Sequence, residues 1–241
     1  FYRTKNGIYP EDSIKEAHRY IDAGFEAFKL KIGFGVEEDI VFLKAIRDAV
    51  GNKIKIMADA NGAYNAAQAR RIIKATEDLN LYFYEELLAP ENIKGYQEIK
   101  NLSGSYIAAG EQVFGKMGYQ PWLEQRALDI IQPDLCSSGG ITECKKIAAI
   151  AQANQVVMIP HVWGSGIGIA ASLQFIASIP PSPISLNPTH PLLEFDQSSH
   201  PFRKNLIFDG IAMNNGKVQI PTKPGIGVEV DRSIIMEYKI N

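Results

Sequence analysis

Residues 27–32 read Ala27-Phe28-Lys29-Leu30-Lys31-Ile32, an apolar run that carries two lysines two positions apart. In a β-strand, alternate side chains point to opposite faces, so Lys29 and Lys31 share one face and the apolar residues take the other. The segments on both sides have the spacing of amphipathic helices, which indicates a parallel sheet with helices on both faces. Two ammonium groups are costly there unless they stand at a polar mouth. A half-exposed edge strand with solvated lysines is the alternative that this stretch leaves open.

The composition is that of an ordinary globular protein, with 241 residues, 46% hydrophobic and 22% charged, enough for one barrel-sized domain or two smaller ones. A net charge of −2 gives no electrostatic footprint for nucleic acid or an anionic membrane. Cys136 and Cys144 fit no metal-finger spacing and are typical of reduced thiols. No apolar run reaches the roughly 18 residues of a membrane span. We therefore expect a cytoplasmic protein and, because the chain begins at Phe1, a fragment.

Short apolar runs alternate with helical periods along most of the chain. The helical stretches have apolar residues three and four positions apart, and Asn65 is placed to cap one of them. We expect strands at residues 27–32, 54–59, 81–85, 106–109, 130–132, 156–159 and 191–195. We expect helices whose apolar residues span 14–21, 40–50, 69–79 and 141–151, and further helices near residues 93–102, 120–126 and 167–179.

Seven or eight strand-helix units in under 200 residues favour a (β/α) barrel over an open doubly wound sheet. An open sheet that binds a dinucleotide would have a glycine-rich turn after its first strand, and Gly33-Phe34-Gly35 lacks the third glycine. The predicted fold class is therefore α/β, a TIM-like barrel. Residues 1–196 are the predicted barrel catalytic domain, and residues 197–241, which are rich in turns, are a C-terminal tail.

Ionisable residues stand at the ends of nearly all the predicted strands: Lys29, Lys31, Asp59, Glu85, Glu86, Glu111, Asp134, His161 and Glu194. In a barrel, the carboxyl ends of all strands meet at one mouth, so these residues become neighbours across a shared cleft. Three carboxylates from adjacent strands repel one another there, and a divalent cation relieves the repulsion. Oxygen ligands without cysteine favour Mg²⁺ over Zn²⁺.

The proposed metal is flanked by lysines on one side and by a histidine with an aspartate on the other. This arrangement suits removal of a proton from a carbon next to a carboxylate, because the metal and the cations stabilise the enediolate charge while a base on either face takes the proton. A lysine base must be partly neutral. Desolvation, the neighbouring ammonium of Lys29 and the metal all favour loss of a proton from Lys31.

The strand-end motifs are Lys29-Leu30-Lys31, Asp59-Ala60-Asn61, Glu85-Glu86, Gly110-Glu111-Gln112, Gln132-Pro133-Asp134, Gly139-Gly140-Ile141-Thr142-Glu143 and Pro160-His161. In order and spacing this series resembles the mandelate racemase subgroup of the enolase superfamily, in the mandelate racemase/muconate lactonizing enzyme family. The resemblance covers nearly the whole chain. It implies a barrel of the modified (β/α)7β type and a Mg²⁺ site whose ligands are Asp59, Glu85 and Glu111.

The resemblance also implies the bases. Lys31 would be one general base, and His161 paired with Asp134 would be the base on the opposite face. Lys29 would help to lower the pKa of Lys31 and would contact the substrate carboxylate.

Further residues of the pocket follow from the same resemblance. Glu194 resembles the acid of the eighth strand that hydrogen-bonds the enediolate oxygen, with Asp196 as its nearby rival. Asn61 is expected to line the substrate pocket. Glu86 and Trp163 are candidates for pocket-lining or supporting positions.

Two departures from the family pattern stand out. Leu87 follows the paired glutamates where the family commonly has proline, which changes the loop but should leave the ligand oxygen of Glu85 in place. The second is the absence of the N-terminal capping domain that closes the site in the superfamily. We expect the tail, residues 197–241, to be the surface on which that domain would pack. Barrels of this type often associate, so a homo-oligomer is among the expected states.

The leading function is dehydration of a sugar acid to a 2-keto-3-deoxy acid, with a small carboxylic acid as the partner. Racemisation or epimerisation of an α-hydroxy acid uses the same residues, and the sequence does not separate the two. A metal-free aldolase with a Schiff base at Lys29 or Lys31 would leave the carboxylates without a purpose. A barrel without its cap that binds metal and turns nothing over is the non-catalytic alternative.

Overall fold

The computed structural model describes residues 9–181, 186–187 and 191–240. The chain divides into two compact units. Unit 1 consists of Phe1–Ala109 with Trp122–Ile130, and unit 2 consists of Gly110–Pro121 with Ile131–Asn241. Each unit is described by itself. The predicted boundary at residue 196 remains a prediction.

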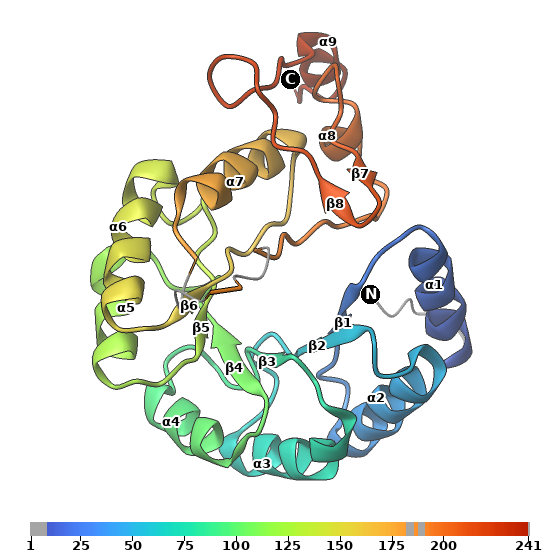
Figure 1. Ribbon diagram of the computed structural model, residues 1–241, viewed down its shortest axis with the longest axis vertical. Coiled ribbons are helices and arrows are strands. Elements are labelled where there is room, and N and C mark those ends of the chain that lie inside the picture. Colours follow the sequence, from blue (N-terminus) through green and yellow to red (C-terminus); the bar gives the residue numbers. More distant parts are fainter. Residues whose placement is uncertain (1–8, 182–185, 188–190, 241) are drawn as a thin grey trace. The chain divides into compact units, whose positions relative to one another are not determined.

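Unit 1 alternates helices and parallel strands along the chain (Figure 1). The strands β1 to β4 are hydrogen-bonded in sequence order, and every pair is parallel. The elements are α1 (Glu11–Asp22), β1 (Ala27–Lys31), α2 (Val36–Val50), β2 (Lys55–Asp59), α3 (Ala66–Ala75), the 3-10 helix η1 (Glu77–Leu79), β3 (Phe83–Glu85), α4 (Ile93–Leu102) and β4 (Tyr106–Ala109). The predicted α/β alternation is confirmed here.

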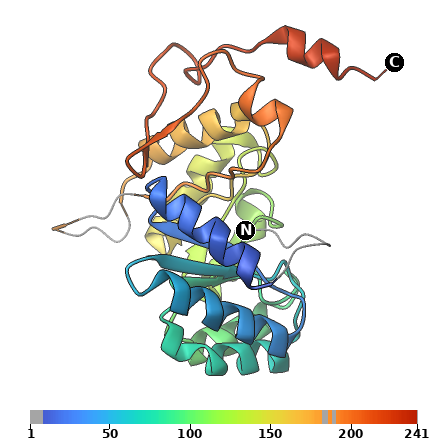
Figure 2. The ribbon, with the colours of Figure 1, turned by 90° about the vertical axis from the view of Figure 1, so that its right-hand side faces the viewer.

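Unit 2 continues the alternation and then adds short elements. Its elements are α5 (Gly115–Glu124, whose last turn belongs to unit 1), β5 (Ile130–Ile131, whose first residue belongs to unit 1), α6 (Gly140–Ala153), β6 (Val157–Met158), α7 (Gly166–Ser178), α8 (Pro201–Lys204), β7 (Met213–Asn214), β8 (Lys217–Val218) and α9 (Arg232–Glu237). The order β1 to β6 forms one sheet, and β7 pairs with β8 in an antiparallel ribbon. Helix α7, drawn gold, and helix α8, drawn orange, lie side by side (Figure 2).

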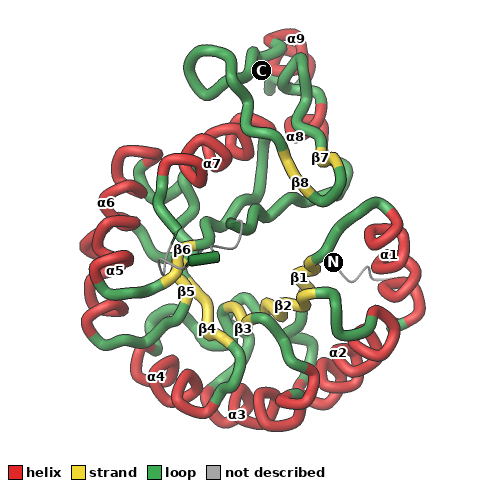
Figure 3. Tube along the Cα trace, in the orientation of Figure 1, coloured by secondary structure: helices red, strands yellow, loops and turns green. Residues whose placement is uncertain are grey.

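Strand β1 shows the alternation of buried and half-buried side chains that its sequence predicts. Along β1 the side chains of Phe28 and Leu30 are buried, whereas Lys29 and Lys31 are half-buried on the other face. The helices α2, α3 and α4 cover one side of strands β1 to β4 (Figure 3). Asn65 caps α3 as predicted, since its side chain accepts the amide of Gln68 while the Gln68 side chain accepts the amide of Asn65.

Three predicted elements need correction. Residues 191–195 form no strand in the described part of the chain, because Pro191 has no amide and a side chain, that of Glu194, takes the amide of Val162. The predicted helix at residues 120–126 is α5, which begins at Gly115 and contains Pro121. The helix predicted to reach residue 79 ends at Ala75 and is followed by η1.

Among the helices that the structure describes, none combines the length and the apolar character needed to cross a membrane.

Candidate active site

Three predicted site residues of unit 1 stand in one row at the ends of neighbouring strands. The register pairs Lys31 on β1 with Asp59 on β2, and Asp59 with Glu85 on β3. Parallel pairing carries side chains of equal register onto the same face of a sheet. The sequence separations of 28 and 26 positions therefore become contacts between neighbours.

Two lysines accompany the two buried carboxylates of this row. The Lys29 Nζ donates to Glu85 Oε1 at 2.6 Å and lies 3.8 Å from Asp59 Oδ2. Lys31 forms an ion pair with Asp59. The side chains of Asp59 and Glu85 are 0% and 1% exposed, whereas those of the lysines are 19% and 20% exposed. Buried carboxylates are costly unless partners compensate them, and the two lysines supply that compensation here.

Asn61 fixes the amine of Lys31 from a second side. Its Oδ1 accepts a hydrogen bond from Lys31 Nζ at 2.7 Å, and its own amide donates to Asp59 Oδ1 at 2.9 Å. The backbone of Asn61 has a φ of 44°, a left-handed conformation that asparagine adopts more readily than most residues. The tight turn after β2 thus points an amide oxygen at the lysine.

The loop that follows Lys31 is held by a contact that sequence reasoning missed. Asp39, in the first turn of α2, accepts the amides of Gly33 at 2.6 Å and Phe34 at 3.2 Å, and it also accepts the hydroxyl of Tyr64. Burial and the bond to Asp39 raise the pKa of Tyr64. The loop that follows Lys31 and the loop that contains Asn61 are therefore tied together. A buried aspartate six positions after Gly33 was the available signal.

In unit 2, His161 lies between two predicted site acids. Its Nδ1 is 2.7 Å from Asp134 Oδ2, and its Nε2 is 3.1 Å from Glu111 Oε2. The other oxygen of Asp134 accepts the amide of Cys136 at 2.6 Å. A carboxylate behind Nδ1 sets the tautomer and the orientation of the imidazole, whose Nε2 faces Glu111.

The structure separates the two acids that compete in sequence for the eighth strand position. Glu194 Oε2 accepts the amide of Val162, the residue after His161, at 2.7 Å. Asp196 instead forms an ion pair of 2.9 Å with the buried Arg203. Glu194 is thus the acid that adjoins the histidine segment. Trp163, two positions after His161, is 57% exposed.

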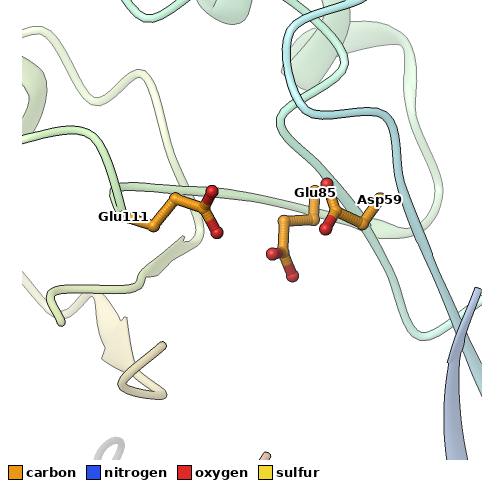
Figure 4. Close-up of side chains that lie close together, drawn as sticks. All are labelled: Asp59, Glu85 and Glu111. Carbon is orange, nitrogen blue, oxygen red and sulfur yellow. The ribbon is translucent and has the colours of Figure 1, made fainter. Parts of the chain in front are cut away.

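Three acids each offer one carboxylate oxygen to a metal ion: Asp59, Glu85 and Glu111 (Figure 4). Asp59 and Glu85 belong to unit 1, and Glu111 belongs to unit 2. The register pairs Glu85 with Ala108 on β4, three positions before Glu111 in the sequence. Glu86, next to Glu85, is buried and has a φ of 42°.

Lysines, carboxylates and a histidine thus stand at or just after the strand ends of an α/β scaffold. Residues 12–234 match the family model described as enolase C-terminal domain-like. The chain belongs to this family, and its sequence-level assignment to the enolase superfamily is confirmed.

Relatives with named activities are similar over almost the whole chain. The D-galactarolactone cycloisomerase of Agrobacterium fabrum is 39% identical over 239 residues, which are 99% of this chain and 63% of the relative. The arabinonate dehydratase of Saccharolobus solfataricus is 30% identical over 97% of this chain and 62% of its own. The crystal structure of the 3,6-anhydro-D-galactonate cycloisomerase from Zobellia galactanivorans has a TM-score of 0.88 and 33% identity, covering 96% of this chain and 64% of that one.

These likenesses confirm the predicted fold class, the TIM-like barrel of this superfamily. This chain spans less than two thirds of the length of the relatives that it matches.

Proposed function

We propose that the protein catalyses Mg²⁺-dependent removal of the proton α to a carboxylate and, through it, dehydration of a sugar acid to a 2-keto-3-deoxy acid. One observation carries the proposal: Lys31, Asp59 and Glu85 stand in one row at the ends of three neighbouring strands. The row unites a base with buried carboxylates. The sugar-acid names of the relatives support the class of substrate.

The residues present fit a magnesium ion. The donor set of Asp59, Glu85 and Glu111 contains only carboxylate oxygens, which Mg²⁺ prefers, and no thiolate. Two of the three acids are buried, where a cation relieves their mutual repulsion. When bound, Mg²⁺ would stabilise the negative charge that develops on the substrate carboxylate.

Lys31, in unit 1, acts as the general base. Its amine lies against Asp59 and Asn61, which aim the nitrogen and limit its rotamers. In its neutral form, Lys31 removes the proton on carbon 2, and the electron pair of that C–H bond moves into the enediolate. The neighbouring cation Lys29 contributes to the binding of the substrate carboxylate.

His161, in unit 2, acts as the general acid. Asp134 holds its Nδ1, so a proton on Nε2 can pass to the hydroxyl that leaves carbon 3 as water. The enol that remains tautomerises to the 2-keto acid. Glu194 would hydrogen-bond an enediolate oxygen, and its contact with the amide of Val162, next to His161, supports this role.

A second candidate is cycloisomerisation, favoured by the D-galactarolactone cycloisomerase at 39% identity. The same base removes the same proton, but the leaving oxygen is part of the substrate ring and stays attached, so no water is lost. Racemisation differs again, because the proton returns to the opposite face of carbon 2. The three reactions share their residues and differ in the product.

The test is incubation of the chain with Mg²⁺ and either arabinonate or galactarolactone in heavy water, followed by mass spectrometry and proton NMR. Dehydration gives a product lighter by one water, whereas cycloisomerisation and racemisation give products without loss of water. Lys31→Ala should abolish product formation and the deuterium uptake that accompanies it, which falls on carbon 3 of a dehydration product and on carbon 2 of a racemised one. Lys55→Ala is the matched control, because Lys55 lies at the opposite end of β2 and its register partner is Ala27.

Deuterium uptake that persists in Lys31→Ala and in His161→Asn alike would contradict the proposal. Uptake lost equally in Lys55→Ala would also contradict it, since that lysine has no part in the site. Binding of Mg²⁺ by the parent without any turnover corresponds to the non-catalytic barrel.

A further inference from the structure

Arg203 is a buried cation of unit 2 that lies outside the residues of the proposed reaction. Its side chain is 4% exposed. The Nη2 pairs with Asp196 Oδ2 at 2.9 Å, the Nη1 donates to the carbonyl and the Oγ of Ser198 at 2.8 Å each, and the Nε donates to the Gly164 carbonyl at 3.2 Å. A buried guanidinium is tolerated when its nitrogens are bonded in this way, and its planar fork then has a fixed direction.

These bonds join two segments that are distant in sequence. Gly164 lies three positions after His161 and next to Trp163, whereas Asp196 lies two positions after Glu194. The same two segments already meet where the amide of Val162 donates to Glu194 Oε2 at 2.7 Å. Two contacts thus connect the segment 161–164 with the segment 194–198. The first is the bond between Val162 and Glu194, and the second is the set of bonds made by Arg203. We call this connection the junction.

Apolar packing buries this junction but does not fix how far one segment is shifted along the other. Leu193 and Phe195 pack on the buried cluster of Val162, Ile169 and Leu173. Such contacts are non-directional and would tolerate a shift along the segment. The directional bonds of Arg203 supply the constraint that apolar packing lacks.

The backbone that carries Arg203 is itself closely packed. A Cβ added at Gly166, the first residue of α7, would lie 2.9 Å from the carbonyl oxygen of Arg203 and 3.0 Å from a methyl of Ile207. Only glycine permits this approach of α7 to α8 (Figures 1 and 2). Arg203 is thus anchored through both its backbone and its side chain.

We propose that Arg203 is a positioning residue, which holds the Glu194 carboxylate against the amide of Val162 and so sets the place of Glu194 beside the His161 segment. Its effect on catalysis rests on the proposed function, in which Glu194 and His161 meet the substrate. Arg203 itself touches no reacting atom.

The test replaces Arg203 by lysine in the 241-residue chain. One ammonium group keeps the charge but cannot bond Gly164, Ser198 and Asp196 together. We expect hydrogen exchange at the Val162 amide, followed by NMR, to accelerate about tenfold on release of Glu194. The Ile159 amide, which donates to the Ile131 carbonyl at 3.1 Å in the same unit, should exchange as in the parent.

Arg47→Lys is the matched control. Arg47 is also buried, and it donates to the carbonyls of Leu79, Gly51 and Ile54 within unit 1. Its replacement removes a comparable set of bonds and should leave exchange at Val162 unchanged. If Arg203→Lys fails to fold, Asp196→Asn removes the partner charge with little change of shape and should accelerate Val162 in the same selective way.

Unchanged exchange at Val162, or equal acceleration at Val162 and Ile159, would overturn the proposal. With an active parent, we also expect Arg203→Lys to lower kcat about tenfold with little change in KM, and an unchanged kcat would overturn the positioning role. A parent that takes up no deuterium would contradict the proposed function, whereas exchange at Val162 would still decide what Arg203 does.

Discussion

Lys31 Nζ and Asn61 Oδ1 lie 2.7 Å apart, although the residues are 30 positions apart in sequence and stand at the ends of neighbouring strands. Asn61 makes this contact from a left-handed backbone conformation, with a φ of 44°, which is unfavourable for most residues. An amide oxygen is neutral, so it orients the amine without adding to the negative charge of Asp59. The turn at Asn61 therefore helps to orient the Nζ of Lys31, the proposed base.

Replacement of Asn61 separates its two roles. Asn61→Gly keeps the left-handed turn, whereas Asn61→Ala strains it, and both lose the bond to Lys31. We expect the glycine variant to be more stable by about 1 kcal/mol, because alanine resists positive φ. Both variants should lose substrate-dependent deuterium uptake into the product to a similar extent. Urea unfolding and proton NMR measure the two effects, and full uptake in either variant would contradict the role of Asn61.

Tyr64→Phe removes one hydroxyl from the buried contact with Asp39. The amides of Gly33 and Phe34 still bond Asp39, so we expect a loss of about 1 kcal/mol in the free energy of unfolding rather than loss of the fold. Tyr84→Phe is the control, because that buried hydroxyl bonds Thr76 at 2.6 Å. If the loops after β1 and β2 position Lys31, only Tyr64→Phe slows deuterium uptake. Equal uptake in both variants would mean that the contact is structural alone.

The two cysteines should differ in their reaction with iodoacetamide. Burial raises the pKa of Cys144 to about 11, so its thiolate is scarce at about pH 8.5, where an ordinary thiol is half ionised. Cys136 is exposed, although burial of its sulfur and the neighbouring Asp134 raise its pKa too. We expect mass spectrometry to find Cys136 alkylated first in the native chain and both thiols alkylated after unfolding. Faster native alkylation of Cys144 would contradict the packing of α6.

Glu143 should titrate at unusually low pH. The amide of Lys116, followed by the side chains of Lys146 and Lys116, lowers its pKa to about 2. Because the folded pKa lies below the unfolded one, the associated stability is present above about pH 4.3 and is lost as the pH falls towards 2. Carboxyl carbon NMR should show this midpoint, and Lys146→Ala should raise it. Exposure keeps the effect on stability small, and a midpoint at the ordinary value would contradict the contacts.

Several parts of the site could be predicted from sequence because they depend on short-range rules. The period of two along Lys29 and Lys31 gave the buried and the half-buried face of β1. The alternation of elements gave the order of the strands, and Asp59 and Glu85 then fall at the strand ends that the register joins. Each of these inferences needs only the spacing of neighbours within one element.

The rest depends on contacts between loops, which leave no period in the sequence. The hydrogen bond between Tyr64 and Asp39 joins residues 25 positions apart, and the bond from Arg203 to Gly164 joins residues 39 positions apart. Each connection depends on one side chain. The predicted strand at residues 191–195 is wrong for the same reason, since a carboxylate there takes the place of a strand hydrogen bond. Spacing alone also could not separate Glu194 from Asp196, because their different partners, Val162 and Arg203, are seen only in the structure.

The central claim is that carboxylates at successive strand ends hold Mg²⁺, and calorimetric titration of the metal-stripped chain tests it most directly. We expect saturable Mg²⁺ binding by the parent and by His161→Asn, and loss of binding in Asp59→Asn and Glu85→Gln. Glu98→Gln is the control, because that exposed acid pairs with Arg70 on the neighbouring helix. Equal binding by Asp59→Asn and the parent, or no binding by the parent, would contradict the account.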